Sequence, residues 1–275
     1  MTDFFASFSP CVCAEGDLLG RDVFSRYIAD LIIDMPAEKG LVVGLTGAWG
    51  AGKTTVLNLM AEHFADTLPV IERPSVIWIN PWRLGGQGKP LGQIFTRELL
   101  SKLAKGEDRR IADLFLQIAK ATAIISPNFQ PVQQFLELFP GKEKTSDELL
   151  EIASAELEKR KRKIIFFVED LDRLVPSDCL EILRVAHILF SLPNVITVLS
   201  LDLHQTARSI NLALTNSPTC TTGLAFLEKL IHIRFDLPEV GTEKAAEFYW
   251  NAVRHVSLRA STWNEENFRE VYDSV

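Results

Sequence analysis

Apolar residues along this chain are concentrated in short runs, which are separated by longer segments with a helical repeat. The run from Ile164 to Val168 is apolar at every position, which is typical of a strand buried on both faces of a parallel sheet. Four further short apolar runs have the length of a strand, and one of them stops at Pro81. The expected strands are residues 41–46, 75–80, 164–168, 194–200 and 231–235.

Between Arg21 and Asp34 apolar positions recur every three or four residues, which predicts an amphipathic helix that ends by Pro36. Residues 107–162 also read as helices, interrupted around the prolines between 127 and 140. The other expected helices are residues 53–64, 90–105, 176–190, 203–214, 225–230 and 242–275.

Strands that alternate with helices predict an α/β fold, a three-layer sandwich with a mainly parallel central sheet. We expect an irregular N-terminal segment (1–20), a core (21–238) with a helical insertion (84–162), and a helical C-terminal segment (239–275). The C-terminal segment reads as the start of a subdomain that is either small or cut short. In such sheets ligands bind at the carboxyl ends of the strands, so chemistry is expected there.

A glycine-rich turn between the first strand and the next helix fits the pattern G-x-x-x-x-G-K-[ST], known as Walker A. Its glycines allow positive φ and close approach of backbone N–H groups to phosphate, and the helix N-terminus adds a favourable dipole. Lys53 would then contact the β- and γ-phosphates, and the Thr54 hydroxyl would bind Mg²⁺. A turn without function is the alternative, but the pattern lies between a strand and a helix, as phosphate binding requires. The residues assigned to nucleotide binding are Gly47, Ala48, Trp49, Gly50, Ala51, Gly52, Lys53, Thr54 and Thr55.

Two carboxylates, Glu169 and Asp170, directly follow the strand 164–168. This is the arrangement of a Walker B site, in which one acid holds the Mg²⁺ shell and the other deprotonates the attacking water. We assign Glu169, with Thr54, to the metal and Asp170 to the water. A solvated turn is the alternative, since acidic residues are common after strands.

Other polar residues at strand ends each have two interpretations. Asn80 could orient the attacking water or form a turn before proline, and Asp202 could sense the γ-phosphate or cap the next helix. With Lys53 and Asp170, they complete the set of candidate catalytic residues. Arg173 could stabilise charge at a neighbouring nucleotide, although an ion pair with a nearby aspartate is favoured. Trp49 could stack on a base, but packing against the sheet edge is favoured.

The composition is that of an ordinary globular protein: 275 residues, 47% apolar and 24% charged. A net charge of −7 argues against bulk binding to nucleic acid. The basic run Lys159–Lys163 is the one local signal for such binding, and a solvated helix end explains it better. No apolar run approaches the ~20 residues of a transmembrane helix. The four cysteines do not form a disulfide framework, so we expect a cytoplasmic protein.

Five segments in order resemble the KAP family of P-loop NTPases, over roughly residues 17–238. The phosphate loop carries a tryptophan inside it, and the acidic motif reads Glu-Asp-Leu-Asp-Arg, as in that family. Three further segments are similar: Trp-Ile-Asn-Pro-Trp-Arg, Leu-Ser-Leu-Asp and Phe-Leu-Glu-Lys-Leu-Ile. The matching segments are residues 47–54, 78–83, 169–173, 199–202 and 226–231.

The resemblance implies an additional-strand ATPase core, in which another strand separates the acidic strand from the phosphate-loop strand. It also implies Mg²⁺-dependent binding and hydrolysis of a nucleoside triphosphate, ATP above all. Two features depart from the family. Glu169 stands where the family usually has Asp, and the transmembrane helices that many members insert between the two motifs are missing from this chain.

We therefore expect an ATP hydrolase that works with a protein partner or by self-association. A nucleotide-gated switch, which binds ATP with little turnover, is the alternative, and an ATPase stimulated by nucleic acid is a third. The family includes members linked to bacteriophage exclusion and to membrane-associated signalling. Either role would come to this chain by analogy alone.

Overall fold

The computed structural model describes residues 10–36, 38–85, 91–105, 109–121, 146–159, 162–189, 192–214, 222–241 and Lys244. The strands are β1 (Leu41–Thr46), β2 (Ser75–Ile79), β3 (Ile164–Val168), β4 (Val195–Leu201) and β5 (Ile233–Asp236). The helices are α1 (Asp22–Asp34), α2 (Lys53–Thr67), α3 (Pro81–Leu84), α4 (Leu91–Lys105), α5 (Arg109–Ala121), α7 (Ser146–Glu158), α8 (Pro176–Leu189), α9 (Leu203–Leu214) and α10 (Gly223–Leu230). Two short 3₁₀ turns, η2 (Ala14–Gly16) and η3 (Leu171–Arg173), complete the described elements.

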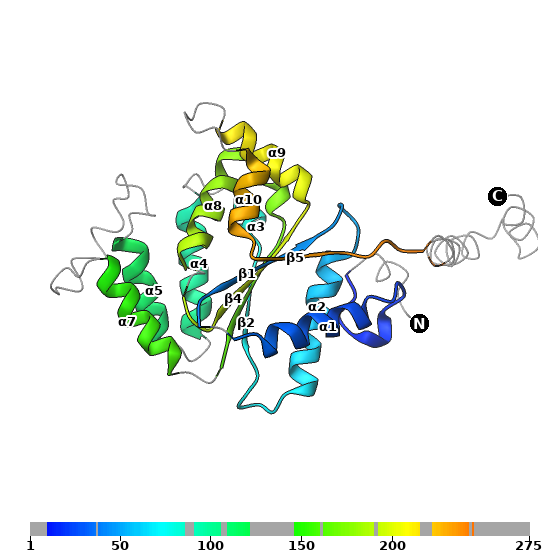
Figure 1. Ribbon diagram of the computed structural model, residues 1–275, viewed down its shortest axis with the longest axis horizontal. Coiled ribbons are helices and arrows are strands. Elements are labelled where there is room, and N and C mark those ends of the chain that lie inside the picture. The colour runs from blue at the N-terminus through cyan, green and yellow to red at the C-terminus, as the bar shows by residue number, and fades with distance from the viewer. Residues whose placement is uncertain are drawn as a thin grey trace, which may run out of the picture.

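The strands form one sheet in the order β2-β3-β4-β1-β5, and every pairing is parallel. This confirms the α/β fold with a parallel sheet. The acidic strand β3 lies beside β4, which lies beside the phosphate-loop strand β1, so the intervening strand implied by the family resemblance is present. All five strands therefore end at the same edge of the sheet (Figure 1).

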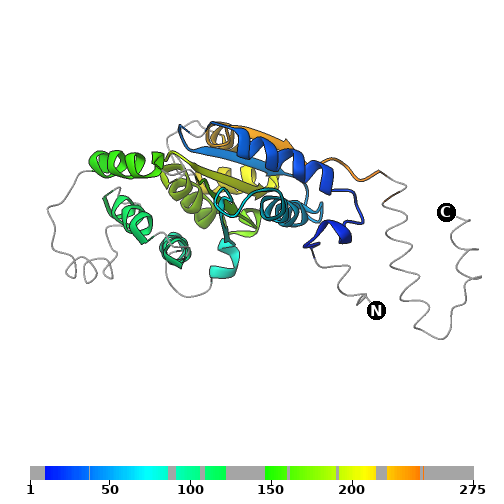
Figure 2. The ribbon, with the colours of Figure 1, turned by 90° about the horizontal axis from the view of Figure 1, so that it is seen from below.

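Helices cover both faces of the sheet because alternate residues of the buried strands point in opposite directions. In β3, Ile165 and Phe167 pack on the face covered by α1 and α2, whereas Phe166 packs on the opposite face with α4, α8, α9 and α10. The two groups of helices lie on opposite sides of the sheet in Figure 1, and Figure 2 gives the view of the same ribbon from below. Each fully buried side chain of this size contributes roughly 1.5–3 kcal/mol of apolar transfer free energy.

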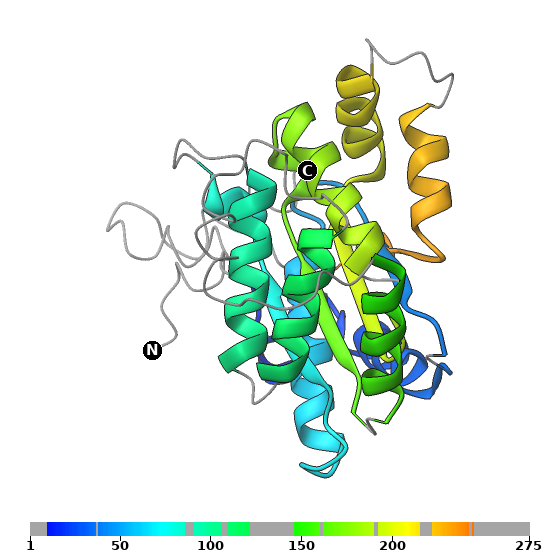
Figure 3. The same ribbon diagram turned by 90° about the vertical axis from the view of Figure 1, so that its left-hand side faces the viewer.

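The helices between the two nucleotide motifs extend this second face. Phe115 of α5 is buried, and its ring centroid lies 6.4 Å from that of Phe166 in β3. Leu157 of α7 belongs to the same apolar core. Figure 3 shows α4, α5 and α7 as neighbouring helices beside the sheet. The expected break near the prolines from 127 to 140, and the helix over 242–275, lie outside the described residues.

The sequence analysis assigned no helix to residues 81–84, so α3 was not predicted. Asn80 follows β2 as the N-cap of α3, and Pro81 occupies the first helical position, where its missing N–H costs nothing. The interpretation of the basic run as solvated is wrong for two of its members. Lys163 donates to the carbonyls of Ile32, Ile33 and Met35 at the end of α1, and Arg162 Nε donates to the carbonyl of Arg73 at 2.8 Å. Burial is the main cause that lowers the pKa of Lys163.

Gly223 provides a test of the contact between α9 and α10, which lie side by side in Figure 1. A Cβ at this position would lie 2.1 Å from the carbonyl oxygen of Ala207, a backbone atom of α9 that cannot move alone. Gly223→Ala should therefore lower the free energy of unfolding by about 1–3 kcal/mol. Gly241→Ala is the matched control, because a Cβ there meets open space, and should change it by less than about 0.5 kcal/mol. Urea unfolding of both variants measures the difference, and equal effects would contradict the packing described here.

Candidate functional site

The phosphate loop has the backbone conformation that its glycines predicted. Gly50 and Gly52 have φ of 82° and 93°, and α2 begins immediately afterwards at Lys53. The loop is attached to the neighbouring strand, because the Gly47 N–H donates to the carbonyl of Leu201 in β4 over 3.3 Å. The backbone thus enters α2 close to the carboxyl ends of β3 and β4.

The side chain of Lys53 folds back over this loop. Its Nζ donates to the carbonyl oxygens of Gly47 at 2.7 Å and Ala48 at 3.0 Å. Burial is the largest influence on Lys53 and lowers its pKa, while the carboxylates of Asp172, Asp202 and Asp170 act in the opposite direction. The ammonium group therefore lies among the acids that follow β3 and β4, although these residues are more than 100 positions away in sequence.

Glu169 lies against the first turn of α2, because the Thr54 hydroxyl donates a hydrogen bond to its carboxylate. Burial raises the pKa of Glu169, and this hydrogen bond partly counteracts the shift. Its Oε1 is buried and has no hydrogen-bond partner among the described residues. A buried carboxylate oxygen without a partner, beside a hydroxyl oxygen, fits a hard cation such as Mg²⁺, which prefers oxygen ligands. The two residues assigned to the metal are thus in contact.

Asp170 adopts a left-handed backbone conformation, with φ of 56° and ψ of 32°. Non-glycine residues rarely adopt this conformation, and it is often found at functional sites. Both of its carboxylate oxygens have partners: Oδ2 accepts from Asn80 Nδ2 at 2.7 Å, and Oδ1 lies 3.0 Å from Arg173 Nε. The side chain lies 26% exposed, between the end of β2 and the turn η3.

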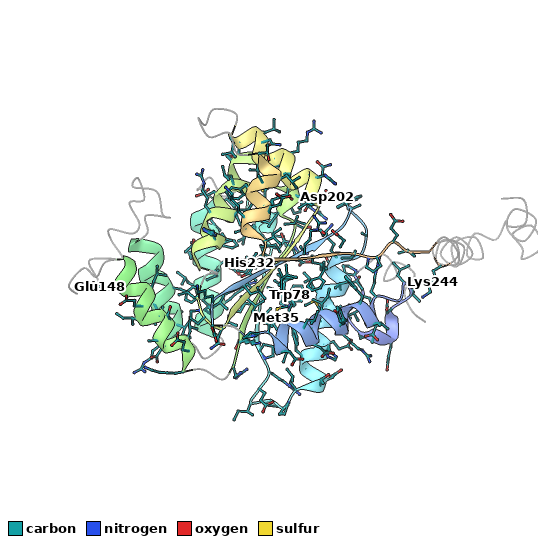
Figure 4. The ribbon with its side chains drawn as sticks, in the orientation of Figure 1. Met35, Trp78, Glu148, Asp202, His232 and Lys244 are labelled. Carbon is teal, nitrogen blue, oxygen red and sulfur yellow. The ribbon has the colours of Figure 1, made fainter. Side chains whose placement is uncertain are left out.

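The polar residues at the other two strand ends, Asn80 and Asp202, each cap a helix. Asn80 Oδ1 accepts from the N–H of Arg83 at 3.2 Å and caps α3, while its Nδ2 contacts Asp170. Asp202 Oδ1 accepts from the N–H of Gln205 at 3.0 Å and caps α9. Figure 4 labels Asp202, which lies at the edge of the sheet where β4 ends. Both residues also lie beside the site. Asn80 contacts Asp170, and the carboxylate of Asp202 acts electrostatically on Lys53.

Arg173 forms the expected ion pair with Asp170, but the expectation that Trp49 packs against the sheet edge is wrong. Trp49 is 76% exposed. The guanidinium of Arg173 lies over its ring, 5.9 Å from the centroid, and over the ring of Trp82, 5.4 Å away. The arrangement was not predicted from sequence, although all three residues belong to motifs that resemble the KAP family.

Sequence reasoning also missed Arg21, which precedes α1 and is only 4% exposed. Its Nη2 donates to the carbonyl of Ala51 in the phosphate loop at 2.9 Å, and its Nη1 donates to the carbonyl of Pro238 after β5. Thr55 accepts from the N–H of Cys11 at 3.3 Å. Cys11 and Arg21, in the N-terminal part of the chain, therefore contact the phosphate loop and the first turn of α2. A charged residue just before an amphipathic helix was the available signal for Arg21.

No helix within the described ranges is both long enough and apolar enough to cross a membrane. Within these ranges, no three His, Cys, Asp or Glu side chains cluster in a way that could hold a metal. A magnesium site that used Thr54 and Glu169 would consequently depend on water and phosphate for its other ligands.

Comparison with known proteins gives one family and several partial matches. The family model described as KAP family P-loop domain matches residues 21–270. The phage T7 exclusion protein of Escherichia coli (strain K12) is 25% identical over 252 residues, which cover 81% of this chain and 33% of that protein. The phosphonates import ATP-binding protein PhnC 1 of Pseudomonas syringae pv. tomato is 38% identical over 55 residues, 20% of each chain. The chain thus spans about a third and a fifth of the lengths of these relatives.

Among solved structures, the ORC2 protein of Aeropyrum pernix in its ADP form is similar, with a TM-score of 0.42 and 11% identity. The similarity covers 84% of this chain and 51% of that one.

The burial of Glu169 leads to a prediction about pH and stability. Because its pKa is raised in the folded chain, the protonated form stabilises the fold fully below the ordinary pKa of 4.5, and this contribution is lost as pH rises through the raised value. Because glutamine does not titrate, the Glu169→Gln variant does not lose this contribution to stability. We expect the stability of the variant relative to the parent to increase between about pH 4.5 and pH 8, as measured by urea unfolding at several pH values. The exposed Glu72→Gln is the control, and a difference independent of pH at position 169 would refute the burial argument.

Proposed function

The chain belongs to the KAP family of P-loop domains. We propose that it binds a nucleoside triphosphate, with ATP as the first candidate, and hydrolyses it in a reaction that requires Mg²⁺. The observation that carries this proposal is the meeting of Lys53, Thr54, Glu169 and Asp170 at one edge of the sheet. These residues come from segments that are distant in sequence, and their residue types are those that phosphoryl transfer requires.

Binding would rest on the phosphate loop. Its backbone N–H groups and the N-terminus of α2 favour an anion, and Lys53 supplies a positive charge. In this structure, Lys53 donates to two carbonyl groups of its own loop. A phosphate oxygen is a better acceptor for an ammonium group than a neutral carbonyl, because the hydrogen bond is then charged on both sides. We therefore expect Lys53 to exchange these carbonyls for phosphate.

Hydrolysis would use Asp170 as the base. As the oxygen of water bonds to the terminal phosphorus, the bond to the bridging oxygen breaks, and one proton of the water passes to the Asp170 carboxylate. The products are a nucleoside diphosphate and inorganic phosphate. Mg²⁺, held by Thr54 and Glu169, would supply neutralisation of the phosphate charge. The hydrogen bond from Asn80 fixes Asp170 from the side of β2 and orients its carboxylate.

The rival proposal is a nucleotide-gated switch, and one observation favours it. Both oxygens of Asp170 already have a partner, so an attacking water has to compete with Asn80 and Arg173 for the carboxylate. A chain that stays in this state would bind its nucleotide and hydrolyse it slowly. Turnover separates the two proposals, since an enzyme cycles and a switch retains its ligand.

The setting of this activity is a further proposal. One relative is named a phage T7 exclusion protein, and this chain matches a third of that protein. We propose a role in excluding phage, carried out with a protein partner or by self-association. Cells that express the chain should give fewer T7 plaques than cells that express Lys53→Ala. Equal plaque numbers at equal protein levels would reject this role and leave the hydrolase proposal untouched.

The direct test is Mg²⁺-dependent ATP turnover by the purified chain and two variants. Lys53→Ala should weaken ATP binding by about 10- to 100-fold, because it removes a charge-assisted contact to phosphate. Asp170→Asn should retain binding and lose about 10²- to 10⁴-fold in turnover, because it removes the base. Calorimetry measures binding, and release of inorganic phosphate measures turnover.

Matched controls use the same chemical changes at exposed positions away from the site. Lys229→Ala on α10 and Asp66→Asn on α2 should bind and hydrolyse ATP like the parent. Tight binding that requires Lys53 without any turnover would favour the switch. No binding by the parent would refute the proposal as a whole.

A further inference from the structure

Arg173 lies where three segments of the site meet. It ends η3, the turn after β3, and its Nε lies 3.0 Å from Oδ1 of Asp170. Its guanidinium also lies over two indole rings, that of Trp49 in the loop after β1 and that of Trp82 in α3, after β2. A single side chain therefore contacts the phosphate loop, the candidate base and the end of β2.

These contacts hold Arg173 only weakly. The side chains of Arg173 and Asp170 are 39% and 26% exposed, and ion pairs of this exposure contribute little to stability. Trp49 is 76% exposed and Trp82 is 51% exposed, so their attraction for the guanidinium is also reduced by water. Arg173 can consequently leave this position for a stronger acceptor at small cost.

The charge of Arg173 acts within the candidate phosphate site. It lowers the pKa of Lys53, the residue assigned to phosphate, and the pKa of Glu169, the residue assigned to the metal. The contact with Trp49 places the guanidinium against the phosphate loop itself. A guanidinium binds phosphate through two parallel hydrogen bonds, and a terminal phosphate carries more charge than a carboxylate.

We propose that Arg173 binds the terminal phosphate of a triphosphate held in the same chain, and that Asp170 retains it until that phosphate arrives. The proposal rests on the nucleotide binding proposed above. Moving Arg173 to phosphate removes a competing partner from Oδ1 of Asp170, where water then binds and gives up a proton, and separates the guanidinium from Trp49 and Trp82. A diphosphate lacks the γ-phosphate, so Arg173 stays paired with Asp170 when a diphosphate binds. Arg173 is thus the residue that distinguishes the triphosphate from the diphosphate.

The first measurement compares the affinities for ATPγS and ADP, in the presence of Mg²⁺, by calorimetry. In Arg173→Ala we expect the affinity for ATPγS to fall about 10-fold or more, with the affinity for ADP within about twofold of the parent. Arg173→Lys should fall between the two, because it keeps the charge and loses the planar fork. Arg26→Ala is the control: Arg26 forms an exposed ion pair with Asp22 on the same helix and lies away from the site, so both affinities should stay unchanged.

The second measurement is tryptophan fluorescence. In the parent, ATPγS should change the emission and ADP should not, because only the triphosphate removes the guanidinium from the two indoles. The nucleotide-dependent change should shrink in Trp49→Phe and in Trp82→Phe, and it should disappear in Arg173→Ala. A change of equal size with ADP would overturn the proposal.

The outcomes separate this proposal from the one on which it rests. If the parent binds neither nucleotide, nucleotide binding fails and this proposal fails with it. If the parent binds both, and Arg173→Ala keeps the same ratio of affinities, only the role of Arg173 is rejected. A mixture of Arg173→Ala with Lys53→Ala that regains turnover would show that Arg173 serves a neighbouring chain, which also overturns action within one chain.

Discussion

The complete burial of β3 determines the electrostatics of the site. All five of its residues are buried on both faces, and the chain passes from this apolar strand directly to Glu169 and Asp170. Burial of the Glu169 carboxylate against this apolar core removes hydration, which favours its neutral form. Burial accordingly raises the pKa of Glu169, and the Thr54 hydrogen bond and the charges of Arg83 and Arg173 counteract it only in part. Because these groups compensate the loss of hydration only in part, the Glu169 carboxylate is a suitable ligand for a cation.

The same constraint links the ends of neighbouring strands. Ile79 and Val168 are paired in the sheet, and the N–H of Glu169 continues the ladder by donating to the carbonyl of Ile79 at 3.1 Å. The chain then leaves the sheet sharply, through a left-handed residue at Asp170, at a cost of about 1–2 kcal/mol. Contacts of Asp170 with Asn80 and Arg173 offset this cost, so the conformation and the position of the carboxylate are maintained together.

The sequence predicted the strands to within about two residues, because burial on both faces leaves a simple apolar signature in β3 and β4. It also predicted which residues lie near one another, since the carboxyl ends of parallel strands share one edge. It could not predict the exposure of Trp49 or the position of Arg173 over two indoles. That arrangement depends on how far the segments after β1, β2 and β3 extend beyond the sheet, and these distances are set by tertiary packing. The capping roles of Asn80 and Asp202 were left open for a related reason, since one polar side chain can serve a helix and a site together.

The contacts of Arg173 also limit how far this conformation can suppress hydrolysis. An exposed ion pair contributes about 0–1 kcal/mol, and each exposed cation–π contact contributes about 0.5–1 kcal/mol. Together they stabilise the state in which Arg173 is paired with Asp170 by roughly 1–3 kcal/mol, which corresponds at most to a reduction in rate of about 5- to 150-fold. A reduction of this size slows a hydrolase without abolishing its turnover. A chain that bound ATP and never hydrolysed it would need a second cause, and the longer side chain of Glu169 at the metal position is the feature of this site that could supply one.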